Sequence, residues 1–272
     1  MSIETQFFIM IDPDYLLDPT RKSRIMTPEA YVNEVRAVIS NLTKSAVGRA
    51  VLETIRVWKR GVRIAPVDTG GVDVCGVEVS DGGRIQVKDL QFNAVLPLLK
   101  IFDPKVFAIR STVHFIPRLD MSVPKCKELF GDAKKNDYRP TPEEVLIHEL
   151  THAIRNFTFT EKGDQPDLKI GPKITESNDE FVAILVENMF QSEKGANIRF
   201  SHDNFTTLDA KLQESFEYFK FSKIAFRAVE TFVRINPFFT ERLRKTGVKF
   251  NPLEAFRQNP VKCRQMSELA LQ

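Results

Sequence analysis

The feature that most constrains this chain is a pair of histidines four residues apart in an apolar segment. His148 and His152 enclose Glu149 in the pattern H-E-x-x-H, and the surrounding residues 145–154 are otherwise apolar apart from Thr151. Residues at positions i and i+4 share one face of a helix, so both imidazoles can reach the same metal ion. Glu149 then lies beside the metal, where it can accept a proton from a water. This pattern is typical of zinc hydrolases, chiefly peptidases.

The residues just before the motif predict where its helix begins. Thr141 suits the N-cap, Pro142 suits the first helical position, and Glu144 completes a T-x-x-E capping box. The motif therefore lies about two turns into a well-capped helix whose apolar residues would anchor it to the core. The alternative is a pair of buried histidines that only make hydrogen bonds, and the helical context favours the metal site over it.

The sequence also narrows the choice of a third metal ligand. A catalytic zinc takes three protein ligands and keeps one position open. In the metzincin pattern a glycine and a third histidine follow the second histidine, but those positions hold Arg155 and Thr158. A glutamate from a following helix is the alternative, and residues 174–188 predict such a helix.

Three glutamates of that segment fall on roughly one helix face: Glu176, Glu180 and Glu187. We favour Glu180 as the ligand because it lies inside the helix that the S-x-x-E pattern at Ser177 predicts. Glu176 is the second candidate, and Glu187 is expected to support a ligand instead of binding the metal. Ligating imidazoles usually donate their other N–H to an oxygen, and Asp179 or Asn178 could accept it.

The likeness to a known family extends beyond these residues. The stretch 144–155 resembles the NleD-like zinc metallopeptidases, a family of bacterial effector proteins. The other segments that look like elements of this family are residues 45–52, 113–117, 179–184 and 186–188, with Arg199. The resemblance implies a compact zincin-like domain that is delivered into another cell and cuts a protein substrate there. The family pattern has a tyrosine three residues after the arginine, where this chain has His202.

These residues predict a mechanism of peptide hydrolysis. Zinc held by His148, His152 and Glu180 would polarise a water and the scissile carbonyl, and Glu149 would pass the water's proton to the leaving amine. The oxyanion needs a further donor besides zinc, and His202 is the candidate that we select. Arg199 and Tyr138 are the other candidates for this role.

The resemblance and the hydropathy pattern together predict an α+β fold. We expect a zincin-like catalytic domain at residues 1–205 and a helical C-terminal extension packed on it at residues 206–272. A small mixed or antiparallel sheet is expected from alternating segments at residues 6–11, 62–66, 72–79, 84–87 and 113–117. Residues 113–117 would be an edge strand able to pair with an extended substrate.

Helices are expected from a cap at Thr27, over residues 46–58, and from about residue 206 to the stop at Asn236–Pro237. His114 suits the face of the edge strand better than a metal site. The last twenty residues are polar and are expected to fray.

Composition excludes several classes of partner. The chain has 272 residues, of which 42% are hydrophobic and 28% charged, as in a folded protein. A net charge of +3 does not predict nucleic-acid binding, and no apolar run is long enough to span a membrane. The three cysteines are far apart, which argues against a disulfide framework and for a reducing compartment.

The N-terminus lacks the basic start and apolar stretch of a signal peptide. We therefore expect synthesis in the cytoplasm, with any export into a target cell through a dedicated secretion system. The expected partner is a protein or peptide substrate, joined by a secretion chaperone or an immunity protein if the chain is an effector or toxin.

Two other functions stay open. One is a zinc hydrolase acting on a non-protein substrate or a cell-wall peptide, and the other is a binding protein with a degenerate metal site. The intact Glu149 argues against the second, since a purely structural zinc site has no use for a base.

Overall fold

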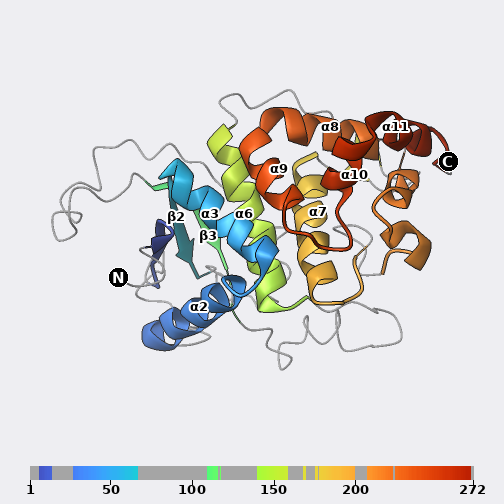
Figure 1. Cartoon of the computed structure of the whole chain (residues 1–272). Helices are drawn as coiled ribbons and strands as arrows, with labels where there is room; N and C mark the ends of the chain where they lie inside the picture. Colours follow the sequence, from blue (N-terminus) through green and yellow to red (C-terminus); the bar gives the residue numbers. More distant parts are fainter. Residues whose placement is uncertain are drawn as a thin grey trace.

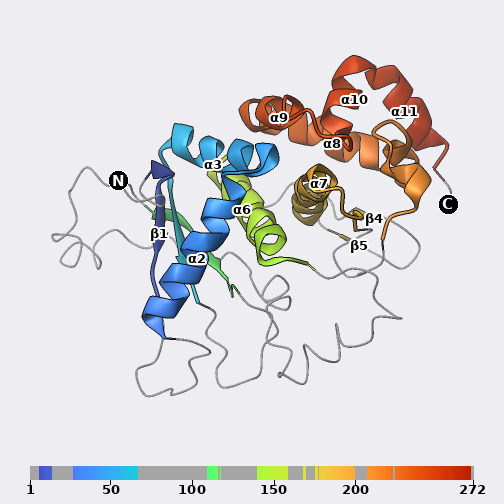
Figure 2. The ribbon, with the colours of Figure 1, turned by 60° about the horizontal axis from the view of Figure 1, so that its bottom comes forward.

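The computed structural model describes residues 6–13, 27–66, 109–115, 117, 140–158, 168–169, 175–176, 178–199, 207–222 and 224–270. This part of the chain is mixed α/β and mostly helical, with one small three-stranded sheet (Figure 1). In Figure 2 the helices α2, α3 and α6 lie on one side of the sheet, α7 lies next to α6, and the C-terminal helices lie beyond α7. The metal motif is on α6, which therefore lies between the sheet and α7.

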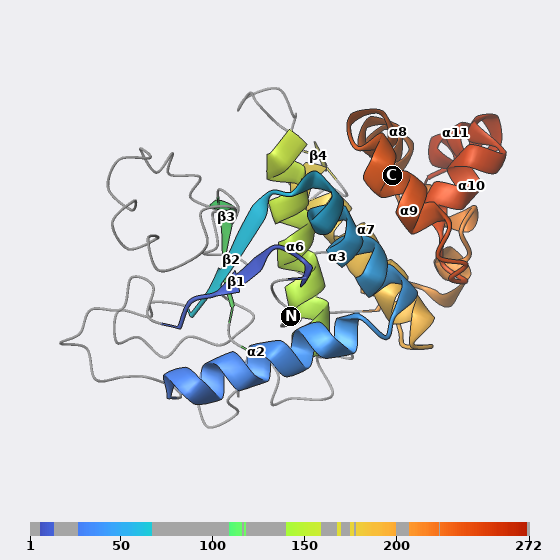
Figure 3. The ribbon, with the colours of Figure 1, turned by 60° about the vertical axis from the view of Figure 1, so that its left-hand side comes forward.

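The sheet is parallel, not mixed or antiparallel as the sequence predicted. Its strands β1 (Ile9–Ile11), β2 (Gly61–Ala65) and β3 (Ile109–His114) run in the order β1-β2-β3, with both pairs parallel (Figure 3). The chain passes from β1 to β2 through two helices, which return it to the same end of the sheet and allow parallel pairing. An antiparallel pair does occur elsewhere, between the short strands β4 (Leu168–Lys169) and β5 (Thr175–Glu176).

The central strand is more deeply buried than its alternating sequence suggested. All five residues of β2 are buried, including Arg63, whose Nε lies 3.5 Å from Asp12. β3 is the edge strand of the described sheet, as predicted, but it spans residues 109–114 and not 113–117. The predicted strands at residues 72–79 and 84–87 lie outside the described residues.

The two helices between β1 and β2 begin where predicted, the first at the predicted cap Thr27 and the second with a cap, Ser45, that the structure adds. Thr27 accepts a hydrogen bond from Ala30 N at the start of α2 (Pro28–Leu42), and Ser45 accepts one from Gly48 N at the start of α3 (Ala46–Trp58). Gly48 lets these helices meet closely, because a Cβ at this position would lie 2.2 Å from the carbonyl oxygen of Leu42.

The helix α6 (Pro142–Thr158) carries the metal motif and has the predicted capping box. Thr141 N donates to Glu144 Oε2 over 2.8 Å, and Glu144 N donates to Thr141 Oγ1 over 3.4 Å. α6 packs against β3 on one side and α7 (Asn178–Glu193) on the other. Almost every side chain of α7 between Phe181 and Gln191 is buried, so this helix lies in the core.

The far end of α7 is tied to the start of α3. The carboxylate of Glu193 accepts hydrogen bonds from Ser45 Oγ at 2.6 Å, Ala46 N at 2.6 Å and Val47 N at 3.0 Å. The two backbone donors belong to the first turn of α3, whose N–H groups have no partner within the helix. A negative charge at this end of the helix is also favoured by the helix dipole.

The C-terminal region is helical, but it differs from the predicted continuous helix after residue 206. It begins with two 3-10 helices, η2 (Ala210–Gln213) and η3 (Glu217–Phe221), and continues with α8 (Ala225–Ile235). The predicted stop at Asn236–Pro237 is confirmed, and α9 (Pro237–Arg244) starts there. The predicted fraying of the last twenty residues is wrong for the described ones, which form most of α10 (Pro252–Gln258) and all of α11 (Pro260–Glu268); residues 271 and 272 lie outside the described ranges.

Packing joins this region to the rest of the chain, with α3 contacting α9 and α7 contacting α8. None of the helices in the described ranges is both long and apolar enough to cross a membrane.

Candidate metal centre

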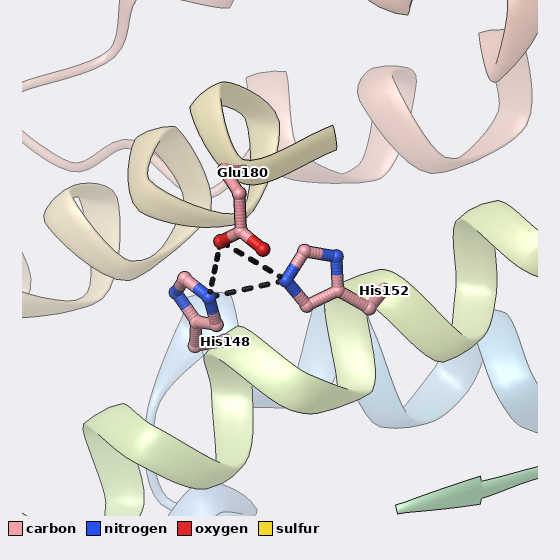
Figure 4. Close-up of side chains that lie close together, drawn as sticks. All are labelled: His148, His152 and Glu180. Carbon is pink, nitrogen blue, oxygen red and sulfur yellow. Dashed lines mark hydrogen bonds and ion pairs between the residues drawn. The ribbon is translucent and has the colours of Figure 1, made fainter. Parts of the chain in front are cut away.

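His148, His152 and Glu180 converge from two helices on one point (Figure 4). His148 Nε2 lies 3.1 Å from His152 Nε2 and 3.1 Å from Glu180 Oε2, and His152 Nε2 lies 3.4 Å from the same carboxylate oxygen. Both imidazoles are buried, and the Glu180 side chain is 27% exposed. The cluster could therefore bind a metal ion that solvent reaches from the Glu180 side.

The spacing of these atoms fits zinc. Ligand atoms at roughly 2.05 Å from a tetrahedral zinc are about 3.3 Å apart, close to each edge of the observed triangle. Two imidazole nitrogens and one carboxylate oxygen are also a donor set used by catalytic zinc sites, which leave a fourth position open. The residues present thus fit this ion in both chemistry and distance.

The second nitrogen of His152 is held by a carboxylate on α7. His152 Nδ1 lies 2.6 Å from Asp179 Oδ2, as the sequence predicted for Asp179 or Asn178. Asp179 Oδ1 in turn accepts a hydrogen bond from Nε of Arg155, which is 1% exposed. With Nδ1–H directed at Asp179, a neutral His152 would have its unprotonated Nε2 available to bind an ion.

The second nitrogen of His148 is held in the same way. His148 Nδ1 lies 3.0 Å from Glu187 Oε2, so Glu187 supports a ligand as the sequence suggested. Glu187 accepts from Arg199 Nη1 at 3.2 Å and from Gln191 Nε2 at 3.3 Å. The backbone of Arg199 is fixed by Asn188, whose side chain bonds both its N–H and its carbonyl.

The carboxylates control the protonation of the imidazoles. Burial alone lowers the pKa of His148, but its hydrogen bonds with Glu180 and Glu187 outweigh burial and raise that pKa to about 9. The pKa of His152 is also raised well above its usual value, by Asp179 and Glu180 against the effect of burial. Burial raises the pKa of Asp179, but His152 and Arg155 outweigh it and lower that pKa to about 2.

The surroundings of Glu149 bring the pKa of its carboxyl close to neutral pH. It is 3% exposed, and its Oε1 has no hydrogen-bond partner among the described residues. Burial raises its pKa to about 7, opposed by the charges of His152 and His148. A carboxyl with this pKa can both accept and return a proton near neutral pH.

Several sequence candidates for the site lie outside the described residues or away from the cluster. Glu176 lies in β5, and its side chain is outside the described residues, as are His202 and Tyr138. Arg199 is buried and bonded to Glu187, so it supports His148 through this carboxylate. His114 lies on β3 with Nδ1 3.2 Å from Pro66 O and is not a member of the cluster.

Sequence reasoning missed the structural role of Arg155. Arg155 entered the sequence analysis as the position where a metzincin has glycine and as the last residue of the stretch that carries the family resemblance, with no role of its own. A signal was present, because Arg155 follows His148 and His152 at helical spacing and so shares their face of α6.

Comparison with family models, with curated proteins and with solved structures finds no match for this chain.

Proposed function

We propose that the protein is a zinc-dependent endopeptidase. The observation that carries this proposal is the convergence of His148, His152 and Glu180 next to a buried carboxyl, Glu149, whose Oε1 has no hydrogen-bond partner in the part of the chain that the structure describes. A structural zinc site closes its fourth position with a protein ligand and needs no base beside it. A three-residue cluster with an adjacent base is instead what a hydrolase requires.

Each residue of the site has a defined task in this proposal. His148, His152 and Glu180 would hold the ion, which when bound supplies the Lewis acidity that activates a water and polarises a carbonyl. Glu149 accepts the proton of the attacking water and returns it to the leaving amine. Its buried setting suits both steps, because a pKa near neutrality lets one group act as base and then as acid.

The donor that stabilises the oxyanion is also part of the proposal. His202 follows Arg199 by three residues, where the resembling family has a tyrosine, and an imidazole can donate to the same kind of oxygen. We therefore retain His202 for this task.

The substrate class comes from the family resemblance. The segments that resemble the NleD-like metallopeptidases include residues 144–155 of the metal helix and residues 179–184 and 186–188 of the ligand helix, and they favour a bacterial effector that cuts a protein in a target cell. The same resemblance supports a zincin-like arrangement of the catalytic part. The edge strand β3 packs against α6, where an extended peptide could pair with it.

The test is cleavage of a cell-lysate proteome by zinc-loaded wild type and zinc-loaded Glu149→Gln. Glutamine keeps the size of the side chain but cannot accept the proton, so cleavage should fall roughly 10²- to 10⁴-fold. New peptide termini produced by wild type alone support the proposal. Equal cleavage by the two proteins, or none by a zinc-loaded wild type on proteomes of several hosts, contradicts it.

A further inference from the structure

Behind Asp179 lies a buried arginine that has no part in the proposed chemistry. Arg155 is on α6, one turn after His152, and its Nε donates to Asp179 Oδ1 while Asp179 Oδ2 faces His152 Nδ1. The guanidinium of Arg155 also lies over the ring of Phe232, 5.8 Å from its centroid. Phe232 belongs to α8, so Arg155 connects the metal helix with the C-terminal helices.

Arg199 occupies the equivalent place on the other side of the site. Its Nη1 lies 3.3 Å and 3.2 Å from the two oxygens of Glu187, and Glu187 Oε2 faces His148 Nδ1. Arg199 and Glu187 are 6% and 1% exposed. Each imidazole is thus followed by a carboxylate and then by a buried arginine.

The balance of charge at the site explains why a carboxylate and an arginine follow each imidazole. Glu187 is 1% exposed, and a buried carboxylate is costly without a compensating cation; the Asp179 side chain is 39% exposed and is paired with Arg155. With neutral imidazoles, one divalent ion and two guanidiniums balance the carboxylates of the described site, which are Glu149, Asp179, Glu180 and Glu187. The ion alone would leave two of these negative charges uncompensated.

We propose that Arg155 and Arg199 are positioning residues for the metal. Their hydrogen bonds fix the Asp179 and Glu187 side chains, so that each imidazole would direct Nδ1–H at its carboxylate and leave Nε2 for the ion. This inference rests on the proposed zinc site and extends it to two residues that do not touch the metal. Arginine is suited to the task because its planar fork fixes a carboxylate, whereas lysine offers a single mobile charge.

Arg155→Lys and Arg199→Lys test the proposal, with Arg244→Lys as the matched control. Arg244 also binds two carboxylates, Glu241 and Glu254, but on α9 and α10 away from the cluster. Zinc affinity of each folded, metal-free protein is measured by competition with a chromogenic chelator. Visible absorption of the cobalt-substituted protein reports the geometry of the ligands, and circular dichroism reports folding.

The two lysine variants should bind zinc roughly 10- to 100-fold more weakly than wild type, the loss typical of outer-shell partners of metal ligands. Their cobalt spectra should change, while Arg244→Lys should match wild type in both measurements. An arginine with a merely structural role would lower the melting temperature and leave the zinc affinity of the folded protein unchanged. Should one lysine variant not fold, the other carries the test.

Two negative outcomes can be told apart. If wild type binds zinc and both lysine variants bind it equally well, the positioning role is wrong and the zinc site stands. If the wild type binds no zinc, the proposed function fails and the positioning role falls with it. An equal loss in Arg244→Lys also overturns the inference, because the effect would not be specific to the site.

Discussion

Glu180 reaches from α7 to α6, where its Oε2 lies 3.1 Å from Nε2 of His148. This contact joins two helices that are separated by a long stretch of chain, and it brings the third donor of the cluster to the two histidines. The choice of ligand among the glutamates of this segment thus depends on the packing of α6 against α7.

The first prediction concerns this ligand. Glu180→Gln should weaken zinc binding by more than the roughly 10- to 100-fold loss expected for an outer-shell change, because a neutral amide is a poor zinc ligand. Glu176→Gln is the matched control, since Glu176 lies on β5 just before α7. Chelator competition measures both. Unchanged affinity in Glu180→Gln together with a loss in Glu176→Gln would transfer the role to Glu176.

The second prediction concerns pH. The pKa of His148 is raised to about 9, and that of His152 is raised by Asp179 and Glu180 against the effect of burial, so these rings are expected to hold additional protons near pH 7 in the metal-free protein. Zinc binds only neutral imidazole, so binding must release these protons, and affinity must fall as pH falls below about 9. Each proton released weakens binding about tenfold per pH unit.

Calorimetry of zinc binding at pH 7, in buffers of different ionisation enthalpy, counts the protons released. The count should exceed one per ion and should persist in Glu149→Gln, which removes any contribution from Glu149. Identical heats in all buffers would show that the rings are already neutral.

The third prediction concerns the contact between α2 and α3. Gly48→Ala should lower the free energy of unfolding by about 1–3 kcal/mol, because the new methyl group would overlap the backbone oxygen of Leu42. The higher helix propensity of alanine, about 1 kcal/mol, opposes this but cannot move a backbone carbonyl. Urea denaturation measures the change. The control is Val57→Ala, at an exposed position of the same helix, which should change the free energy of unfolding by less than about 0.5 kcal/mol. If Gly48→Ala were more stable than wild type, the close contact between α2 and α3 would not constrain this position.

The fourth prediction concerns Glu193, which caps α3 from the end of the ligand helix. Glu193→Gln should cost about 1–2 kcal/mol of stability, because it removes the charge that the helix N-terminus favours and leaves only one good acceptor. Glu53→Gln removes only an exposed ion pair with Arg56 and should cost less than about 0.5 kcal/mol. Equal losses in the two variants would contradict the capping role.

Local sequence signals predicted the helices that position the site. The caps at Thr27, Ser45 and Thr141 act within one turn, and each is followed by a helix with the expected start. Strand direction could not be predicted in this way, because side-chain alternation is the same in parallel and antiparallel strands. The pairing of β1 with β2 depends on how α2 and α3, which connect these two strands in the sequence, pack against the sheet.

In the C-terminal region, Asn-Pro pairs both end helices and begin them. Asn236–Pro237 ends α8, as predicted, and α9 starts at Pro237 although Asn236 makes no side-chain capping bond. An asparagine before a proline can also cap the helix that begins at the proline. Asn251 and Asn259 act in this way, accepting from Glu254 N and Lys262 N. The predicted helix after residue 206 is divided into 3-10 turns, and the spacing of its phenylalanines did not distinguish these turns from one helix.

For the site, the motif identified His148, Glu149 and His152, and helix position selected Glu180. The supporting roles of Arg155 and Arg199 were not predicted, because their ion pairs with Asp179 and Glu187 join residues far apart in the chain. A charged residue in an apolar helix is usually assigned to the surface, and only tertiary packing shows it buried with a partner.

The most direct test of the central claim is the amount of zinc bound per chain. Wild type and Glu149→Gln are loaded with zinc, dialysed and analysed by mass spectrometry of the metal. One zinc per chain is expected in both proteins, since Glu149 would lie beside the metal without binding it. Absence of zinc from both proteins after loading would contradict the metal centre and the function proposed for it.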